Sequence, residues 1–188
     1  MDKNGKLRIA NRYEGIGSFS EGMAAVKILG KWGFINKNED IVVQPNYEAA
    51  GPFEHGAAPV KKGGKWGLAN ATGREVLKCR YDGVNWQPSG RYTISLGGKK
   101  GLADAAGREI FPPKYDAVTD NGNGFVMLEK SGKLGLSNVQ GYDVLPVIYD
   151  RLYFNASKNF YITGIDSPVQ KYTHVPSQNS EVRSQNGR

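Results

Sequence analysis

An acidic residue follows a tyrosine at five evenly spaced positions of the chain. Each lies 34 residues after the one before: Tyr13-Glu14, Tyr47-Glu48, Tyr81-Asp82, Tyr115-Asp116 and Tyr149-Asp150. Five carboxylates around a shared axis could hold calcium or a basic ligand. Calcium sites, however, gather several acidic ligands within one short loop, a pattern that this sequence lacks. We therefore favour carboxylates that cap turns by accepting backbone N–H bonds, and we expect neither metal nor cofactor.

The aromatic residues could contact a ligand or a partner. A residue repeated at one place in every unit more often fills the core, with its polar end at the rim. We expect this of the five tyrosines and of Trp32 and Trp66. Trp86 departs from the repeat and lies between Asn85 and Gln87. It is therefore a candidate contact residue.

Lysines recur at the same period and could form a basic surface. They are Lys31, Lys65, Lys99 and Lys133, in a chain with 25 Lys and Arg against 18 Asp and Glu, a net charge of +7. A basic stripe attracts polyanions. Lysines at hairpin tips also protect β-proteins from edge aggregation, and we find no nucleic-acid-binding motif. We favour an ordinary charged surface and do not expect a nucleic-acid partner.

Enzymatic chemistry has little support in the sequence. His55 and His174 have no cysteine, histidine or acid at metal-ligand or catalytic-triad spacing. Cys79 lies among Lys78 and Arg80, which could lower its pKa, although an incidental small residue is the favoured interpretation. We expect a protein without catalytic activity.

The elements that would carry these residues are repeated strands. A Gly-Lys-x-Gly motif recurs, and Asn36, Asn70, Asp104 or Asn138 follows its second glycine; these second glycines are Gly33, Gly67, Gly101 and Gly135. Apolar residues alternate at Ala58 and Val60, which predicts a strand with one buried face. Residues 57–82 thus predict a three-stranded antiparallel meander, with a fourth short strand around Ala49 or Val118.

Such units cannot bury their apolar faces alone and must pack on their neighbours. The predicted fold class is all-β, built of tandem 34-residue meanders. Ring-like or propeller-like packing would remove exposed edges, with Asp166 to Lys171 completing the first unit. An open superhelical array is the alternative.

The sequence resembles the bacterial WG-repeat family, also called KWG repeats. The resemblance rests on Gly30-Lys31-Trp32-Gly33, on Pro45-Asn46-Tyr47-Glu48, and on their copies at the 34-residue period. It implies a β-rich tandem-repeat module, often joined to other domains, with no assigned catalytic residues. Lys100 and Leu134 replace the repeat tryptophan.

These observations predict five WG-type units in residues 1–175, the first and last incomplete, followed by a disordered tail or linker at 176–188. No apolar run approaches the roughly 18 residues of a membrane helix. The chain is expected to be cytoplasmic if Met1 is the native start, and exported if it is a fragment.

The predicted function is protein interaction, as an accessory subunit or repeat domain of a larger assembly. Glycan binding is the alternative, and polyanion binding comes third. We expect contacts where the repeat pattern breaks, at Trp86, Lys100, Asn121 and Asn123.

Overall fold

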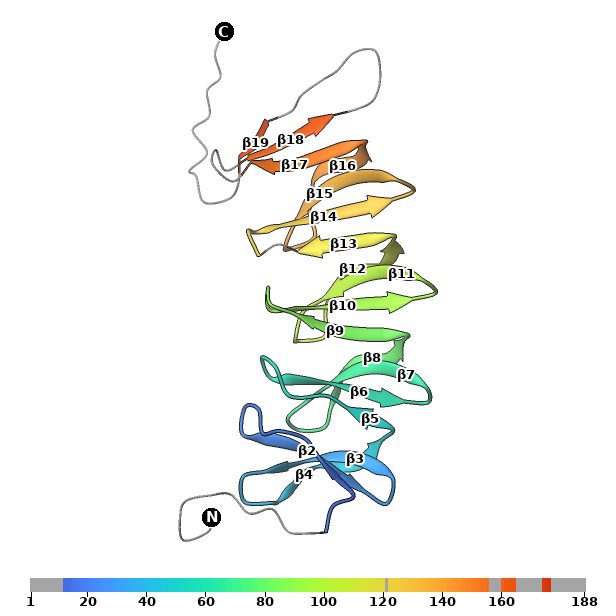
Figure 1. Ribbon diagram of the computed structural model, residues 1–188, viewed down its shortest axis with the longest axis vertical. Coiled ribbons are helices and arrows are strands. Elements are labelled where there is room, and N and C mark those ends of the chain that lie inside the picture. The colour runs from blue at the N-terminus through green and yellow to red at the C-terminus, as the bar shows by residue number, and fades with distance from the viewer. Residues whose placement is uncertain (1–11, 121, 156–159, 165–173, 177–188) are drawn as a thin grey trace. The chain divides into compact units, whose positions relative to one another are not determined.

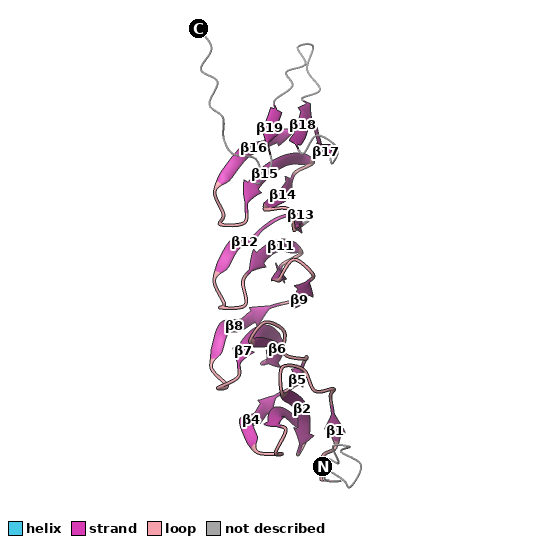
Figure 2. Cartoon of the chain, turned by 90° about the vertical axis from the view of Figure 1, so that its left-hand side faces the viewer, coloured by secondary structure: helices cyan, strands magenta, loops and turns pink. Residues whose placement is uncertain are grey.

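A computed structural model describes residues 12–120, 122–155, 160–164 and 174–176. The chain forms two compact units, Met1–Gly98 with Leu102–Glu109, and Lys99–Gly101 with Ile110–Arg188. The described secondary structure consists of β-strands joined by turns (Figure 2). This confirms the predicted all-β class.

The strands form consecutive antiparallel sheets, shown in Figure 1. The first sheet contains β1 (Gly15–Ile16), β2 (Met23–Ile28), β3 (Lys31–Asn36) and β4 (Ile41–Tyr47). The second contains β5 (Ala49–Ala50), β6 (Ala57–Lys62), β7 (Lys65–Asn70) and β8 (Glu75–Tyr81). The third contains β9 (Gly83–Gln87), β10 (Arg91–Leu96), β11 (Lys99–Ala103) and β12 (Glu109–Tyr115).

The pattern continues in the second unit. The fourth sheet contains β13 (Ala117–Asp120), β14 (Phe125–Lys130), β15 (Lys133–Asn138) and β16 (Asp143–Tyr149). A three-stranded sheet follows, with β17 (Arg151–Asn155), β18 (Phe160–Gly164) and β19 (His174–Pro176). Strands are paired in chain order, so each described sheet is an open meander and none closes into a barrel. The predicted short strands at Ala49 and Val118 are present as β5 and β13.

The second glycine of the Gly-Lys-x-Gly motif is required because the backbone of the following strand passes close to its Cα atom. The pairing of β3 with β4 shifts register on both sides of Phe34, as at a β-bulge. A Cβ on Gly33 would lie 2.4 Å from the Val43 carbonyl oxygen, and one on Gly67 would lie 2.4 Å from that of Leu77. Gly33 and Gly67 do not have a positive φ. Glycine is therefore needed at these positions because a Cβ would collide with the neighbouring backbone.

The hydrophobic core lies between successive sheets. Phe34, Val43 and Tyr47 of the first sheet pack with Ala58 and Val60 of the second. The other face of the second sheet packs through Leu68 and Tyr81 against Tyr92 and Ile94 of the third. The expectation of one buried face is therefore wrong for β6: Ala57 and Ala58 are both 0% exposed, because neighbouring sheets cover both faces.

The fourth strand of each complete sheet is an edge strand, which explains its prolines. Pro45 lies in β4 and Pro113 in β12, where the missing N–H does not interrupt a central ladder. The segment Asp166 to Lys171, predicted to complete the first unit, lies outside the described residues.

Candidate interaction site

The repeated carboxylates cap hairpins, as predicted. Glu14, Glu48, Asp82 and Asp116 each accept N–H bonds from the tip of the next hairpin. Glu48 accepts from the amides of Gly63 at 2.9 Å and Gly64 at 3.0 Å. Glu14 accepts from Gly30, Asp82 from Gly97 and Asp116 from Ser131. The bonds from Gly64 and Gly63 help to lower the pKa of Glu48.

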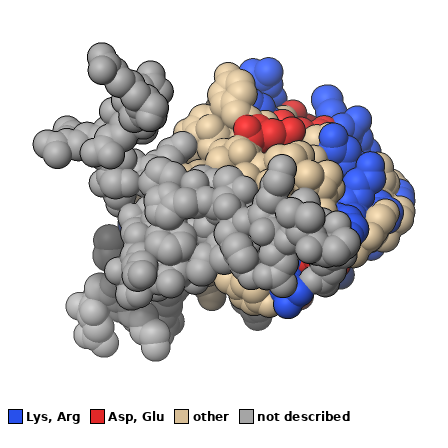
Figure 3. Space-filling view, turned by 90° about the horizontal axis from the view of Figure 1, so that it is seen from above, with Lys and Arg blue, Asp and Glu red and all other residues tan. Residues whose placement is uncertain are grey.

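The repeat lysines are also engaged. Lys65 donates to Asp82 at 2.6 Å, and the same 17-residue offset joins Lys99 to Asp116 and Lys133 to Asp150. Each of these aspartates is thus bound by the lysine of one hairpin. Asp82 and Asp116 also accept a backbone N–H bond from the tip of the next hairpin. The Lys65 and Gly97 bonds lower the pKa of Asp82, and the Lys99 and Ser131 bonds lower that of Asp116. Basic side chains accordingly lie beside acidic ones on the visible face in Figure 3.

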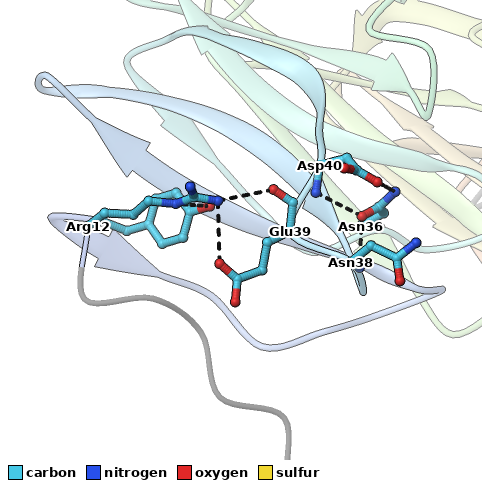
Figure 4. A network of polar contacts seen from close by, with 6 residues as sticks. Arg12, Asn36, Asn38, Glu39 and Asp40 are labelled. Carbon is cyan, nitrogen blue, oxygen red and sulfur yellow. Dashed lines mark hydrogen bonds and ion pairs between the residues drawn. The ribbon is translucent and has the colours of Figure 1, made fainter. Parts of the chain in front are cut away.

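The turn after β3 is closed by the side-chain amide of Asn36. The Asn36 Oδ1 atom accepts from the amides of Asn38 at 2.9 Å and Asp40 at 3.0 Å (Figure 4). Glu39 has φ +64° where later units have glycine. Arg12 donates to its backbone carbonyl and carboxylate, shown in the same view. Glu39 is therefore bound by Arg12, a residue that lies outside this turn.

The repeat tyrosines are core residues with polar rims. Tyr47, Tyr81, Tyr115 and Tyr149 are buried, and Tyr13 is half-buried. The Tyr81 hydroxyl donates to Glu109 at 2.6 Å, and Arg80 pairs with the same carboxylate. Burial and the bond to Glu109 raise the pKa of Tyr81 to about 12.

The residues predicted to make contacts differ in their surroundings. Trp86 is half-buried; its ring stacks on His55 with centroids 4.6 Å apart and meets the edge of Tyr92. Lys100 and Lys31 are exposed. Asn123 accepts the amide of Phe125 within a turn, and Asn121 lies outside the described residues.

Cys79 is not activated. Lys78 and Arg80 could have lowered its pKa, but burial, followed by the charge of Glu75, raises the pKa of the thiol to about 11. Cys79 is half-buried, and the thiolate is disfavoured in that setting.

A hollow of about 230 Å³ lies between the first and second sheets. The half-buried Trp32 forms one wall, and the rest of the lining is small: Gly17, Ser18, Ala25, Ala50, Gly51 and Pro52. The loops around it are tied together, since Ser20 donates to the Phe53 carbonyl at 2.6 Å. Glu21 also accepts from the amides of His55 at 2.7 Å and Gly56 at 2.8 Å. The hollow is therefore held open by fixed loops.

The hairpin tip of the first sheet carries an exposed leucine that sequence reasoning missed. Leu29 is 90% exposed and has φ +48°, between β2 and β3. Gly63, Gly97 and Ser131 occupy this position in later units. A period alignment alone could have found the signal, which is an apolar residue standing where other units have glycine or serine.

Within the described ranges, no group of three or more His, Cys, Asp and Glu residues could hold a metal ion. The described part of the chain also has no helix long and apolar enough to cross a membrane.

Comparison with known proteins identifies the family. The family described as WG containing repeat matches residues 1–32, 32–66, 66–99 and 101–133. The chain belongs to this family. These WG repeats share the 34-residue period of the tyrosine-acid pairs, and the resemblance expected from the sequence is confirmed.

No curated protein matches the WG-repeat chain. Among solved structures, a eukaryotic initiation factor is 9% identical with a TM-score of 0.43, covering 89% of this chain and 53% of the other. Hsv2 of Kluyveromyces lactis is 10% identical with a TM-score of 0.36, covering 80% and 58%. PorZ, a surface component of the type-IX secretion system of Porphyromonas gingivalis, is 10% identical with a TM-score of 0.34, covering 87% and 27%. The chain thus spans less than two thirds of each.

Proposed function

We propose that this WG-repeat chain is a non-catalytic protein-interaction module, an accessory subunit or repeat domain of a larger assembly. The observation that carries the proposal is Leu29, 90% exposed at a hairpin tip. A left-handed conformation costs an L-residue roughly 1–2 kcal/mol. Single exposed apolar residues are common on protein surfaces, but Leu29 stands in a left-handed conformation where later units have Gly63, Gly97 and Ser131. Its own fold recovers none of the cost by burial, so we take it as a candidate contact residue.

The repeated polar groups support the same role by exclusion. Carboxylates cap hairpin amides, and Lys65, Lys99 and Lys133 are paired with aspartates. The groups that recur in every unit thus maintain the fold. The surface available for recognition is made by residues that differ between units, as in other repeat proteins.

A photo-crosslinking side chain at position 29 tests the proposal. The matched control carries the same side chain at Gly63, the equivalent hairpin tip with φ +60°. We expect position 29, but not position 63, to capture one discrete protein from native cells.

Competition with Leu29→Gly makes the test specific. Glycine adopts this φ without strain, so the variant should fold at least as well as the parent. Unlabelled parent chain should displace the captured protein, and Leu29→Gly should do so about tenfold less well. Equal capture at positions 29 and 63, or equal competition by Leu29→Gly, would contradict the proposal.

A glycan-binding module is the second candidate, favoured by the open hollow beside the Trp32 indole. Aromatic faces commonly support apolar ligand surfaces, with a few polar groups fixing orientation. A glycan array probed with the parent and Trp32→Ala should show hits lost in the variant. An array without hits removes this candidate.

A further inference from the structure

The residues that line the hollow beside Trp32 differ from those at the equivalent positions one repeat later. Moving forward by one 34-residue period replaces Ala25 by Pro59, Ala50 by Val84, Gly51 by Asn85 and Pro52 by Trp86. Each replacement is larger than the residue it replaces. Four lining positions that are small around Trp32 therefore carry bulkier side chains around Trp66.

The second pair of sheets also indicates which group fits this space. A Cβ built on Gly51 would lie 3.3 Å from Cδ of Pro59, so the proline ring fills the space beside Gly51. At the equivalent place in the first sheet, Gly17 faces Ala25, whose methyl carbon lies 3.5 Å and whose carbonyl oxygen lies 3.7 Å from such a Cβ. The hollow thus lacks the pyrrolidine ring that the next unit provides from its own chain.

We propose that the hollow beside Trp32 binds a proline ring from an extended segment of a partner protein. This inference rests on the proposed protein-interaction function and assigns it a site and a ligand chemistry. Proline-rich segments dock on aromatic-lined grooves in an extended form that loses little entropy on binding. Trp32 supplies the aromatic wall, and Pro52 extends the apolar lining.

The size of the hollow favours one ring over a larger ligand. Its volume of about 230 Å³ is below the roughly 300–1,000 Å³ of most small-molecule sites. A single anchor side chain of a partner fits such a space. Because the loops are already tied by Ser20 and Glu21, binding requires little ordering.

The polarity of the lining favours proline over a sugar. Ser18 is the lining residue with a side-chain hydroxyl, and Gly17, Ala25 and Ala50 offer no polar side-chain atom. A sugar ring would bring several hydroxyl groups, and burying them without partners costs free energy. A pyrrolidine ring carries no donor that needs a partner.

Titration of the full chain with an acetylated, amidated hexaproline peptide tests the inference, with binding followed by calorimetry and amide chemical shifts. Two variants should weaken binding about tenfold or more: Trp32→Ala removes the wall, and Ala25→Pro fills the hollow by copying Pro59. Trp66→Ala is the matched control, because Trp66 occupies the same repeat position among larger equivalent residues. Thermal melts of all three variants verify folding.

Binding by the parent and Trp66→Ala, with loss in the other two, supports the inference. No shift of residues around Trp32, or equal loss in Trp66→Ala, overturns it. Binding of cellohexaose at the hollow in place of hexaproline would assign the site to a glycan and would also overturn it. Crosslinking at position 29 tests the proposed protein-interaction function independently. If hexaproline does not bind, the crosslinking result can still be interpreted.

Discussion

Gly107 shows how a single hydrogen atom permits one sheet to approach the next. It lies in the turn between β11 and β12, with φ +85°. A Cβ there would lie 2.0 Å from the carbonyl oxygen of Val76 in β8. The residue is therefore restricted both by its own backbone and by a neighbouring strand.

Gly107→Ala should lower the free energy of unfolding by roughly 3 kcal/mol, because the backbone contact must open. Gly63→Ala is the control: its φ is +60° and nothing lies within 4 Å of the added Cβ. That variant should lose only about 1 kcal/mol from backbone strain. Urea denaturation at 25 °C measures both, and equal losses would show that the Val76 contact is unimportant.

Cys79 should react slowly in the folded protein. Its pKa is raised from 9.0 to about 11, so the thiol remains protonated at neutral and mildly alkaline pH. Thiolate is the reactive form, and at pH 8 there should be about a hundredfold less of it than in an ordinary thiol.

Iodoacetamide labelling followed by mass spectrometry checks this expectation. The rate should rise with pH toward a midpoint near 11, and the urea-unfolded chain should react much faster at pH 8. Equally fast labelling of folded and unfolded protein would mean that Cys79 is accessible and unperturbed.

At the scale of elements, an aspartate joins one sheet to the next at two places. These aspartates follow the third and fourth repeat tyrosines. Asp82 contacts Lys65 of the second sheet and the Gly97 amide of the next hairpin. Asp116 does the same with Lys99 and Ser131. Both hairpin positions are therefore tied to a carboxylate that must be ionised.

Stability should depend on this ionisation in acid. The pKa of Asp82 and Asp116 in the folded chain is lower than the ordinary 3.8, so the folded state binds fewer protons than the unfolded state. Their contribution is complete above pH 3.8 and is lost as the pH falls through the folded-state value.

The double variant Asp82→Asn/Asp116→Asn should lose less of its melting temperature in acid than the parent does. Thermal melts of both proteins from pH 7 to about pH 2.5 measure this difference. Lys65→Met should reproduce part of this flattening, since it removes the first partner of Asp82. Parallel curves for parent and variants would show that these carboxylates do not contribute to acid sensitivity.

At the scale of the whole molecule, the net charge of +7 overstates the available positive surface. Lys65, Lys99 and Lys133 are paired with aspartates. Exposed pairs of this kind add little stability, yet they reduce the local field that a polyanion would meet.

The chain should therefore elute from heparin below about 0.15 M salt, where screening is already strong. Asp82→Asn plus Asp116→Asn should elute later, because two lysines lose their partners. Tight retention of the parent at physiological salt would instead favour the polyanion hypothesis.

Much of the repeated structure could be predicted because each feature depends on neighbours in sequence. The Asn36 cap bonds residues two and four positions later, and the hairpin at Gly63 joins adjacent strands. The burial of Tyr81 and the capping by Glu48 followed from the same period. Local chemistry repeated at a fixed spacing leaves little choice of element type.

The candidate site was harder to predict because it depends on distances between units. Trp86 stood out by breaking the pattern, but only the fold shows its ring against His55 and Tyr92. Cys79 lies among cations in sequence, whereas in the fold burial and Glu75 dominate its pKa. Sequence proximity was a poor guide to the electrostatic environment.

The sequence by itself determined the WG-repeat family, the all-β class and the residues that recur, because period and turn chemistry are written along the chain. Only the tertiary structure decided that Leu29 is exposed and that the space beside Trp32 is open. The physical reason is that exposure and empty volume depend on which side chains meet across sheets. Here Ala25 and Gly51 leave open a place that larger residues occupy one repeat later.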